Sequence, residues 1–187
     1  RIMGVMQQLV VADPQDYTAD IGPVINSTAL KQLSAHVANM REQASVLLQV
    51  PLSEQLQSRC FFPPTLIELS SLAQLTQENF GPILHIIRYQ DTELEQVLAD
   101  INENGYGLTM GIHSRMSSKI KMIIANSKVG NIYVNRNMIS AVVGVQPFGG
   151  TGLSGTGPKA GGPNYLQRFT TEQTVTTNIA AIGGDVG

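Results

Sequence analysis

The stretch ILHIIRYQDTELEQVLADINENGYGLTMGIHSRMSSKIKMIIANSKVGNIYVN, residues 83–135, decides the fold. Thr92 and Glu95 have the spacing of a helix capping box, and Gly105 follows that helix as a terminating glycine. The periodicity predicts three strands that alternate with two helices, over residues 83–89, 92–104, 109–113, 117–127 and 131–135. This βαβαβ order implies an α/β fold with a largely parallel sheet and flanking helices.

Two further elements precede this stretch. Asn26 or Ser27 can cap a helix whose apolar side chains recur at helical spacing, at Leu30, Leu33, Val37, Met40 and Ala44. The later segment 60–69 is β-prone but contains Pro63 and Pro64, which predict an edge strand or a bend.

Residues 135–162 form a glycine-rich segment that begins where the last predicted strand ends. Glycine is favoured where backbone approaches a ligand or turns through positive φ, and ligands of open parallel sheets bind beyond the carboxyl ends of the strands. A flexible linker is the alternative, but Val142, Val143 and Phe148 are apolar anchors that linkers lack. The segment is therefore expected to form the wall of a binding site.

Composition excludes several classes of protein. The chain has 187 residues, 42% of them hydrophobic, and a net charge of -2, which fits one sizeable core and no nucleic-acid footprint. No apolar run approaches the roughly 18 residues of a membrane span, so a cytoplasmic protein is expected, any membrane association arising from other parts of the parent protein. The single cysteine, Cys60, and three scattered histidines predict no metal site.

The ends of the chain carry two expectations of their own. Residues 1–11 begin without Met inside an apolar pattern, as after a cut within a longer chain. Residues 1–169 are expected to form one catalytic-domain part. Residues 170–187 are expected to form a β-prone tail that pairs with another chain, giving a homo-oligomer, or with another part of the protein.

Four blocks in order, Gln77–Pro82, Gly105–Ile112, Gly130–Asn135 and Pro147–Gly150, resemble the NAD(P)-dependent aldehyde dehydrogenase superfamily. Residues 143–150 and 154–163 are most similar to its Δ1-pyrroline-5-carboxylate (L-glutamate γ-semialdehyde) dehydrogenase branch, in the form found in bifunctional PutA proteins. The resemblance implies part of an aldehyde dehydrogenase catalytic domain. It also implies NAD-dependent oxidation of L-glutamate γ-semialdehyde to L-glutamate in proline catabolism.

The family's nucleophilic cysteine, general-base glutamate and dinucleotide-binding domain would lie upstream of Arg1. The isolated chain is therefore expected to be inactive, with no catalytic residue of its own. Cys60 precedes Phe61 in a strand-like context without a histidine partner, and it is interpreted as a buried structural cysteine.

By the same resemblance, five residues form the binding sites. Glu78 would accept hydrogen bonds from the nicotinamide-ribose hydroxyls, and Phe80 would contact the nicotinamide side of NAD. Ser140 and Ala141 would belong to a loop whose backbone N–H groups hold the α-carboxylate of the substrate, although the family more often has glycine at the position of Ser140. Phe148 would form an apolar wall around the aldehyde.

Each of these residues also has a structural interpretation. Glu78 could be a helix-end charge, and Phe80 and Phe148 could be core residues. For Lys159, a solvated or loop-bracing lysine is preferred over a substrate ligand.

Two other functions remain open from the sequence. One is a non-catalytic assembly or regulatory module with the same fold, in which the tail makes the contacts. The other is an aldehyde dehydrogenase for a different aldehyde, which would differ only at the carboxylate anchor.

Overall fold

The computed structural model describes residues 1–139 and 141–182. The chain forms two compact units, Arg1–Asn104 and Gly105–Gly187, which are described separately below. Ser140 lies outside the described residues.

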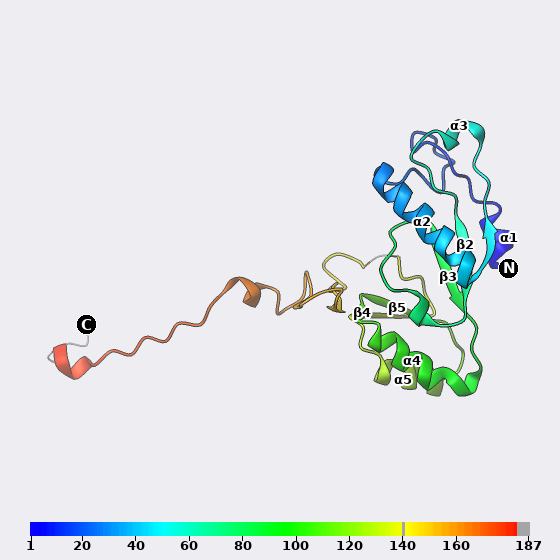
Figure 1. Ribbon diagram of the computed structural model, residues 1–187. Coiled ribbons are helices and arrows are strands. Elements are labelled where there is room, and N and C mark those ends of the chain that lie inside the picture. The colour runs from blue at the N-terminus through cyan, green and yellow to red at the C-terminus, as the bar shows by residue number, and fades with distance from the viewer. Residues whose placement is uncertain (140, 183–187) are drawn as a thin grey trace. The chain divides into compact units, whose positions relative to one another are not determined.

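Unit 1 is built on a three-stranded sheet in the order β1-β2-β3 (Figure 1). The strands are β1 (Ser45–Gln49), β2 (Thr65–Leu69) and β3 (Ile83–Ile87). β1 pairs with β2 in antiparallel fashion, and β2 pairs with β3 in parallel. β2 is therefore the central strand, and its burial on both faces agrees with its run of apolar residues.

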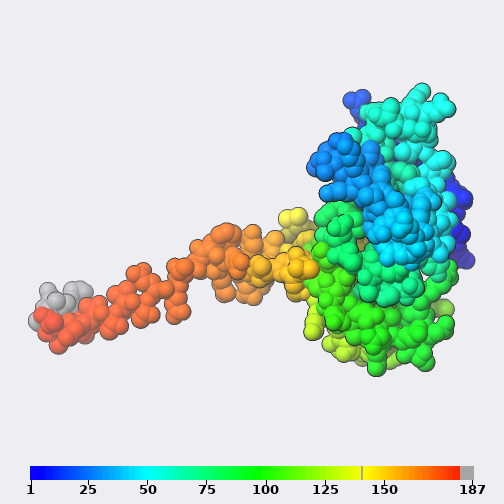
Figure 2. Space-filling view, viewed as in Figure 1, coloured from blue at the N-terminus to red at the C-terminus, as the bar shows by residue number. Residues whose placement is uncertain are grey.

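Helix α2 (Ser27–Gln43) covers one face of this sheet and lies on the side of the molecule shown in Figure 2. Its predicted cap is confirmed, because the Asn26 side chain accepts a hydrogen bond of 2.8 Å from the Ala29 N–H. The apolar face of α2 packs on β2 in a core of Leu33, Val37, Met40, Phe62, Ile67 and Leu69. Burial of each such side chain contributes roughly 1.5–3 kcal/mol.

A second, smaller core lies on the face of β2 opposite α2. Leu66 of β2 packs with Val50 and with Met6 of helix α1 (Ile2–Met6). Because successive side chains of a strand point to opposite faces, Leu66 and Ile67 contribute to different cores.

The remaining elements of unit 1 are α3 (Glu54–Gln57), the 3-10 turns η1 (Leu72–Gln74) and η2 (Asp91–Glu93), and α4 (Leu94–Glu103). The capping box predicted at Thr92 and Glu95 is wrong. Gln90 and Glu93 form it instead, and the Glu93 carboxylate accepts a 2.6 Å bond from the Gln90 N–H. The predicted end of α4 is confirmed, since Gly105 follows it with φ of +83°.

Unit 2 contains a parallel βαβ motif. β5 (Thr109–Ile112) pairs with β6 (Asn131–Val134) in parallel, and α5 (Ser117–Asn126) connects them. A second ladder joins β4 (Tyr106–Gly107) to β7 (Thr151–Gly152) in antiparallel fashion. The 3-10 turns η3 (Leu166–Phe169) and η4 (Ile179–Ile182) follow.

The predicted α/β class is confirmed, with two corrections. The described strands form three sheets, in which β2–β3 of unit 1 and β5–β6 of unit 2 are the parallel pairs and β1–β2 and β4–β7 are antiparallel. The edge strand predicted from Pro63 and Pro64 is also wrong: both prolines precede β2, and the Pro64 carbonyl accepts a 2.9 Å bond from the Val50 N–H. Residues 170–178 form no strand and are exposed, so their predicted pairing with another chain stays a prediction.

Candidate functional site

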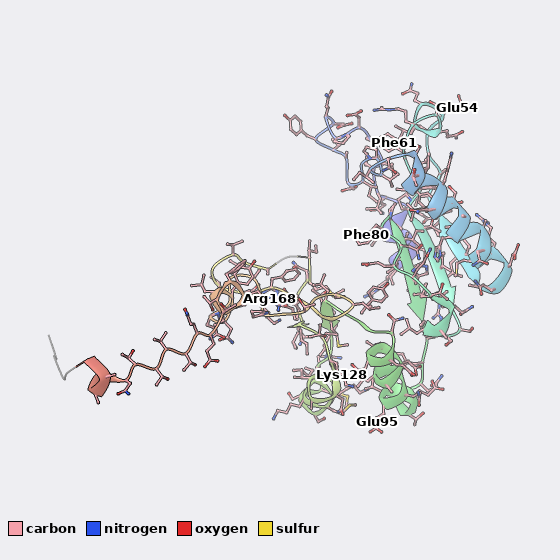
Figure 3. The ribbon with its side chains drawn as sticks, turned by 60° about the vertical axis from the view of Figure 1, so that its left-hand side comes forward. Glu54, Phe61, Phe80, Glu95, Lys128 and Arg168 are labelled. Carbon is pink, nitrogen blue, oxygen red and sulfur yellow. The ribbon has the colours of Figure 1, made fainter. Side chains whose placement is uncertain are left out.

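The loop between η1 and β3, residues 75–82, carries Glu78 and Phe80. Both are exposed, and Phe80 keeps 80% of its surface accessible, so it is not a core residue (Figure 3). Glu78 lies outside any helix and takes no part in the two ion pairs found among the described residues, Asp13–Arg59 and Glu68–Arg88. A carboxylate and an aromatic ring are thus presented together on one surface loop.

Both ends of loop 75–82 are fixed to unit 1. At its start, Leu75 packs against the core under α2. At its end, the Pro82 carbonyl accepts a 2.9 Å bond from the Thr65 N–H, so the loop enters β3 in register with β2. The exposure of Phe80 therefore occurs on an anchored backbone.

In unit 2, a polar knot holds the turn that contains Phe148. The Asn131 side chain donates to the Pro147 carbonyl at 3.0 Å and accepts from the Gly149 N–H at 3.3 Å. The Lys159 ammonium donates to Asn131 Oδ1 at 2.9 Å, to the Gly149 carbonyl at 3.3 Å and to the Gly130 carbonyl. The loop-bracing interpretation of Lys159 is confirmed.

Phe148 itself is half-buried, and both of its backbone polar groups bond to Ala160. Its N–H donates to the Ala160 carbonyl at 3.1 Å, and the Ala160 N–H donates back at 2.9 Å. Phe148 borders a hollow of about 330 Å³ together with Gly150, Tyr165 and Arg168. The glycine-rich segment therefore lines a hollow, and its predicted role as the wall of a binding site stays a prediction.

The loop proposed to anchor a carboxylate is closed by Gln146. Gln146 Oε1 accepts a 3.0 Å bond from the Val142 N–H, and the Gln146 N–H donates to the Val142 carbonyl at 2.8 Å. Ala141 is half-buried, and Ser140, the other predicted anchor, lies outside the described residues. Because its N–H is already bonded, Val142 is a poorer donor for a substrate than its neighbours in the chain.

Cys60 is half-buried in a turn, less buried than the sequence interpretation expects. Its carbonyl accepts a 2.8 Å bond from the Val24 N–H, which gives this position a structural role.

Two histidines of unit 1 are perturbed. Burial lowers the pKa of His36 on α2, and burial together with the neighbouring His36 lowers the pKa of His85 on β3. Their Nε2 atoms lie 2.9 Å apart.

Sequence reasoning missed Asn131 and Gln146 as supports of the predicted site. Each joins residues more than three positions away, and the amide type alone carries no signal of such a bond. Asn131 lies in the block Gly130–Asn135 and begins β6, so its place in that family motif was the one signal that the sequence offered for it.

Comparison with known proteins extends these observations. The family model described as aldehyde dehydrogenase family matches residues 1–175. A bifunctional protein PutA of Klebsiella aerogenes is 47% identical over 173 residues, which cover 90% of this chain and 13% of that protein. A 1-pyrroline-5-carboxylate dehydrogenase of Geobacillus sp. (strain WCH70) is 33% identical over 169 residues, covering 89% of this chain and 32% of that protein.

Solved structures agree with these relatives. A proline utilization A protein of Bradyrhizobium japonicum is 54% identical, with a TM-score of 0.88 over 96% of this chain and 18% of its own. A 1-pyrroline-5-carboxylate dehydrogenase from Thermus, solved with bound NAD, is 31% identical, with a TM-score of 0.80 over 90% of this chain and 32% of its own. The chain thus spans about a third or less of the length of these relatives, and the resemblance drawn from the sequence is confirmed.

Across residues 1–139 and 141–182, no helix is long and apolar enough to cross a membrane.

Proposed function

The chain belongs to the aldehyde dehydrogenase family, and we propose that it forms the carboxy-terminal binding part of an NAD-dependent L-glutamate γ-semialdehyde dehydrogenase. In this role it binds the nicotinamide end of NAD and the aldehyde substrate within a longer protein. The reaction yields L-glutamate in proline catabolism.

The observation that carries this proposal is the pair Glu78 and Phe80 on the anchored loop 75–82. An ionised carboxylate with two acceptor oxygens suits the paired hydroxyls of a ribose, and an exposed ring suits contact with a flat heterocycle. Phe80 is 80% exposed, an arrangement that costs hydrophobic free energy unless a partner covers the ring. These residues therefore fit the cofactor.

NAD, when bound, supplies the hydride acceptor for aldehyde oxidation. Glu78 holds the ribose and Phe80 limits the movement of the adjoining ring. Holding the ribose and the adjoining ring would restrict the cofactor before reaction, which is how positioning residues contribute to a rate.

The substrate side is formed by the segment after β6. Ser140 and Ala141 offer backbone N–H groups to the α-carboxylate of the semialdehyde, and Phe148 covers the apolar part of its chain. The polar knot at Lys159 keeps the turn around Phe148 in place, so Lys159 acts on the substrate only through this turn.

We place the attacking thiolate and the general base outside these 187 residues. Cys60 is half-buried in a turn, and within residues 1–139 and 141–182 its one hydrogen bond found is that of its carbonyl with the Val24 N–H, so no histidine is paired with it there. A purified 187-residue chain should then release no NADH from the semialdehyde. Robust turnover that Cys60→Ala abolishes would instead make Cys60 the nucleophile.

A substitution in the full-length protein tests the cofactor assignment. Glu78→Gln removes the charge and one acceptor, and we expect the KM for NAD to rise about 10- to 100-fold, the range of one charge-assisted hydrogen bond. Glu54→Gln, a change of an exposed glutamate in α3, is the matched control and should leave the KM for NAD unchanged. An unaltered KM in Glu78→Gln would remove this residue from the site.

The tail supports a second, compatible proposal. Val175 and Ile179 are 77% and 59% exposed, and the intervening backbone pairs with no strand of the described residues. We propose that this segment adds to the sheet of a second copy, giving a homo-oligomer. Deleting residues 170–187 from the full-length protein should lower its mass in sedimentation experiments, whereas an unchanged mass would refute this role.

A further inference from the structure

A direct contact between two histidines connects α2 to β3. His36 Nε2 and His85 Nε2 lie 2.9 Å apart, and the rings meet edge to face at 79° with centroids 5.1 Å apart. His85 is paired with Ile67 of β2, so it projects from the face of the sheet that α2 covers. The contact joins residues 49 positions apart in the sequence.

The same helix also contacts loop 75–82 and its approach. A Cβ atom on Gly81 would lie 2.7 Å from Leu33 Cδ2, so the loop backbone rests directly on α2. The Gln74 amide donates a 2.6 Å bond to the carbonyl of Gln43, the last residue of α2. A hollow of about 360 Å³ lies between, lined from the helix by Gln32, His36 and Asn39 and from the loop by Thr76, Gln77 and Asn79.

The geometry points to α2 as the support that positions the NAD-binding loop, with His36 and His85 as positioning residues that fix the helix against β3. This inference rests on the proposed role of Glu78 and Phe80. Neither histidine touches the cofactor. They act by keeping the helix surface, on which Gly81 rests, in register with the strand that the loop enters.

The bond between the histidines tolerates one added proton but not two. With both rings neutral, one Nε2–H donates and the other Nε2 accepts. A proton added at the donor ring's other nitrogen leaves this bond intact. A second proton occupies the accepting Nε2, so two N–H groups and two positive charges then oppose each other.

Charged side chains line the hollow beside His85 but not the hollow beside His36. Around His36, the other residues that line the hollow are uncharged. The hollow beside His85 contains Arg88, Tyr89, Glu93 and Asp100, and Arg88 is already paired with Glu68 at 2.5 Å. Burial lowers the pKa of both histidines, so the doubly protonated pair forms only in acid.

Steady-state kinetics of the full-length protein test this inference through the KM for NAD measured against pH. In the wild type this KM should be constant at neutral pH and just below it. It should rise only further into acid, below the ordinary histidine pKa of about 6.5, because the pKa values of both rings are lowered and only the second proton breaks the bond. His36→Phe and His85→Phe, which keep a ring and remove the bond, should raise the KM for NAD about two- to tenfold at all pH values. Neither should alter the KM for the aldehyde.

His36→Gln separates positioning from simple stability. A glutamine oxygen accepts from His85 in either protonation state, so the acid rise of the KM for NAD should disappear in this variant. His113→Gln, at an exposed histidine, is the control and should keep the wild-type profile. A variant that is merely less stable loses active enzyme and hence kcat, without a change in KM.

The outcomes decide between the claims. A wild-type KM for NAD in both phenylalanine variants, or an unchanged acid rise in His36→Gln, would overturn the positioning role. Absence of NAD-dependent turnover in the wild type would instead defeat the proposed function itself.

Discussion

Replacement of Gly130 by alanine probes the polar knot that holds Phe148. A Cβ atom at position 130 would lie 2.8 Å from the carbonyl carbon of Gly149 and 2.9 Å from Cα of Gly150, and it would overlap the Gly149 carbonyl oxygen. Ordinary carbon contacts are about 3.5–4.0 Å. The opposing atoms are all backbone, so no side-chain rotation relieves the overlap and the turn itself must move.

The magnitude follows from three contributions. Overpacking costs about 1–3 kcal/mol, and displacement of Gly149 weakens its bonds to Asn131 and Lys159, each worth about 1 kcal/mol or more. Alanine returns about 0.4–1 kcal/mol by restricting the unfolded chain. We therefore expect Gly130→Ala to lower the free energy of unfolding by about 3 kcal/mol.

Urea unfolding followed by circular dichroism measures this change, with linear extrapolation of the unfolding free energy. Gly4→Ala is the matched control, since an added Cβ there meets no atom within 4 Å and lies within helix α1. Gly4→Ala should leave the free energy of unfolding unchanged or raise it by up to about 1 kcal/mol. A Gly130→Ala chain as stable as the wild type, or a Gly4→Ala chain equally destabilised, would refute the role given to the contact.

Three further predictions concern stability. Lys159→Met should lower the unfolding free energy by about 1.5–3 kcal/mol in the same urea assay because it leaves carbonyl acceptors of the knot unpaired, while Lys121→Met, at an exposed site on α5, should change it by less than about 0.5 kcal/mol. Asn26→Ala should cost about 1 kcal/mol by removing the N-cap of α2, and unchanged thermal melting would contradict that cap. The fold lowers the pKa values of His36 and His85, so as the pH falls the unfolded chain binds protons before the folded chain does. The free energy of unfolding should therefore be highest above about pH 6.5 and decrease as the pH drops below that value. If the melting temperature depends on pH just as strongly after both residues are replaced by glutamine, the two histidines are not the cause.

The elements that the sequence predicts well are those whose signals are local. The Asn26 cap and the apolar spacing of α2 involve residues within a few turns, and they are confirmed. The Thr92 capping box fails because Gln90 and Glu93 offer the same local pattern two residues earlier, with a 3-10 turn before α4. β1 escaped prediction because Val46, Leu47 and Leu48 follow one another without alternation, and its register with β2 shifts between Val46 and Leu48.

The candidate site also contains residues that the sequence identifies and supporting contacts that it does not. The glycine-rich segment and the family blocks identify Glu78, Phe80 and Phe148 as candidates, because motif spacing is a property of the sequence. Their supports are not visible there. The contact of Gly81 with Leu33 and the bonds of Lys159 to Asn131 and Gly149 join distant residues and depend on tertiary packing.

The central claim is that the full-length protein oxidises an aldehyde that carries an α-carboxylate. The most direct measurement is the ratio of kcat/KM, with NAD, for L-glutamate γ-semialdehyde and for an aldehyde of the same length without the α-carboxylate and amino groups. Charge-assisted hydrogen bonds from the anchor loop, at about 1.5–3 kcal/mol each, predict a ratio of at least roughly 10 to 100 in favour of the semialdehyde. A ratio near one would contradict the substrate assignment.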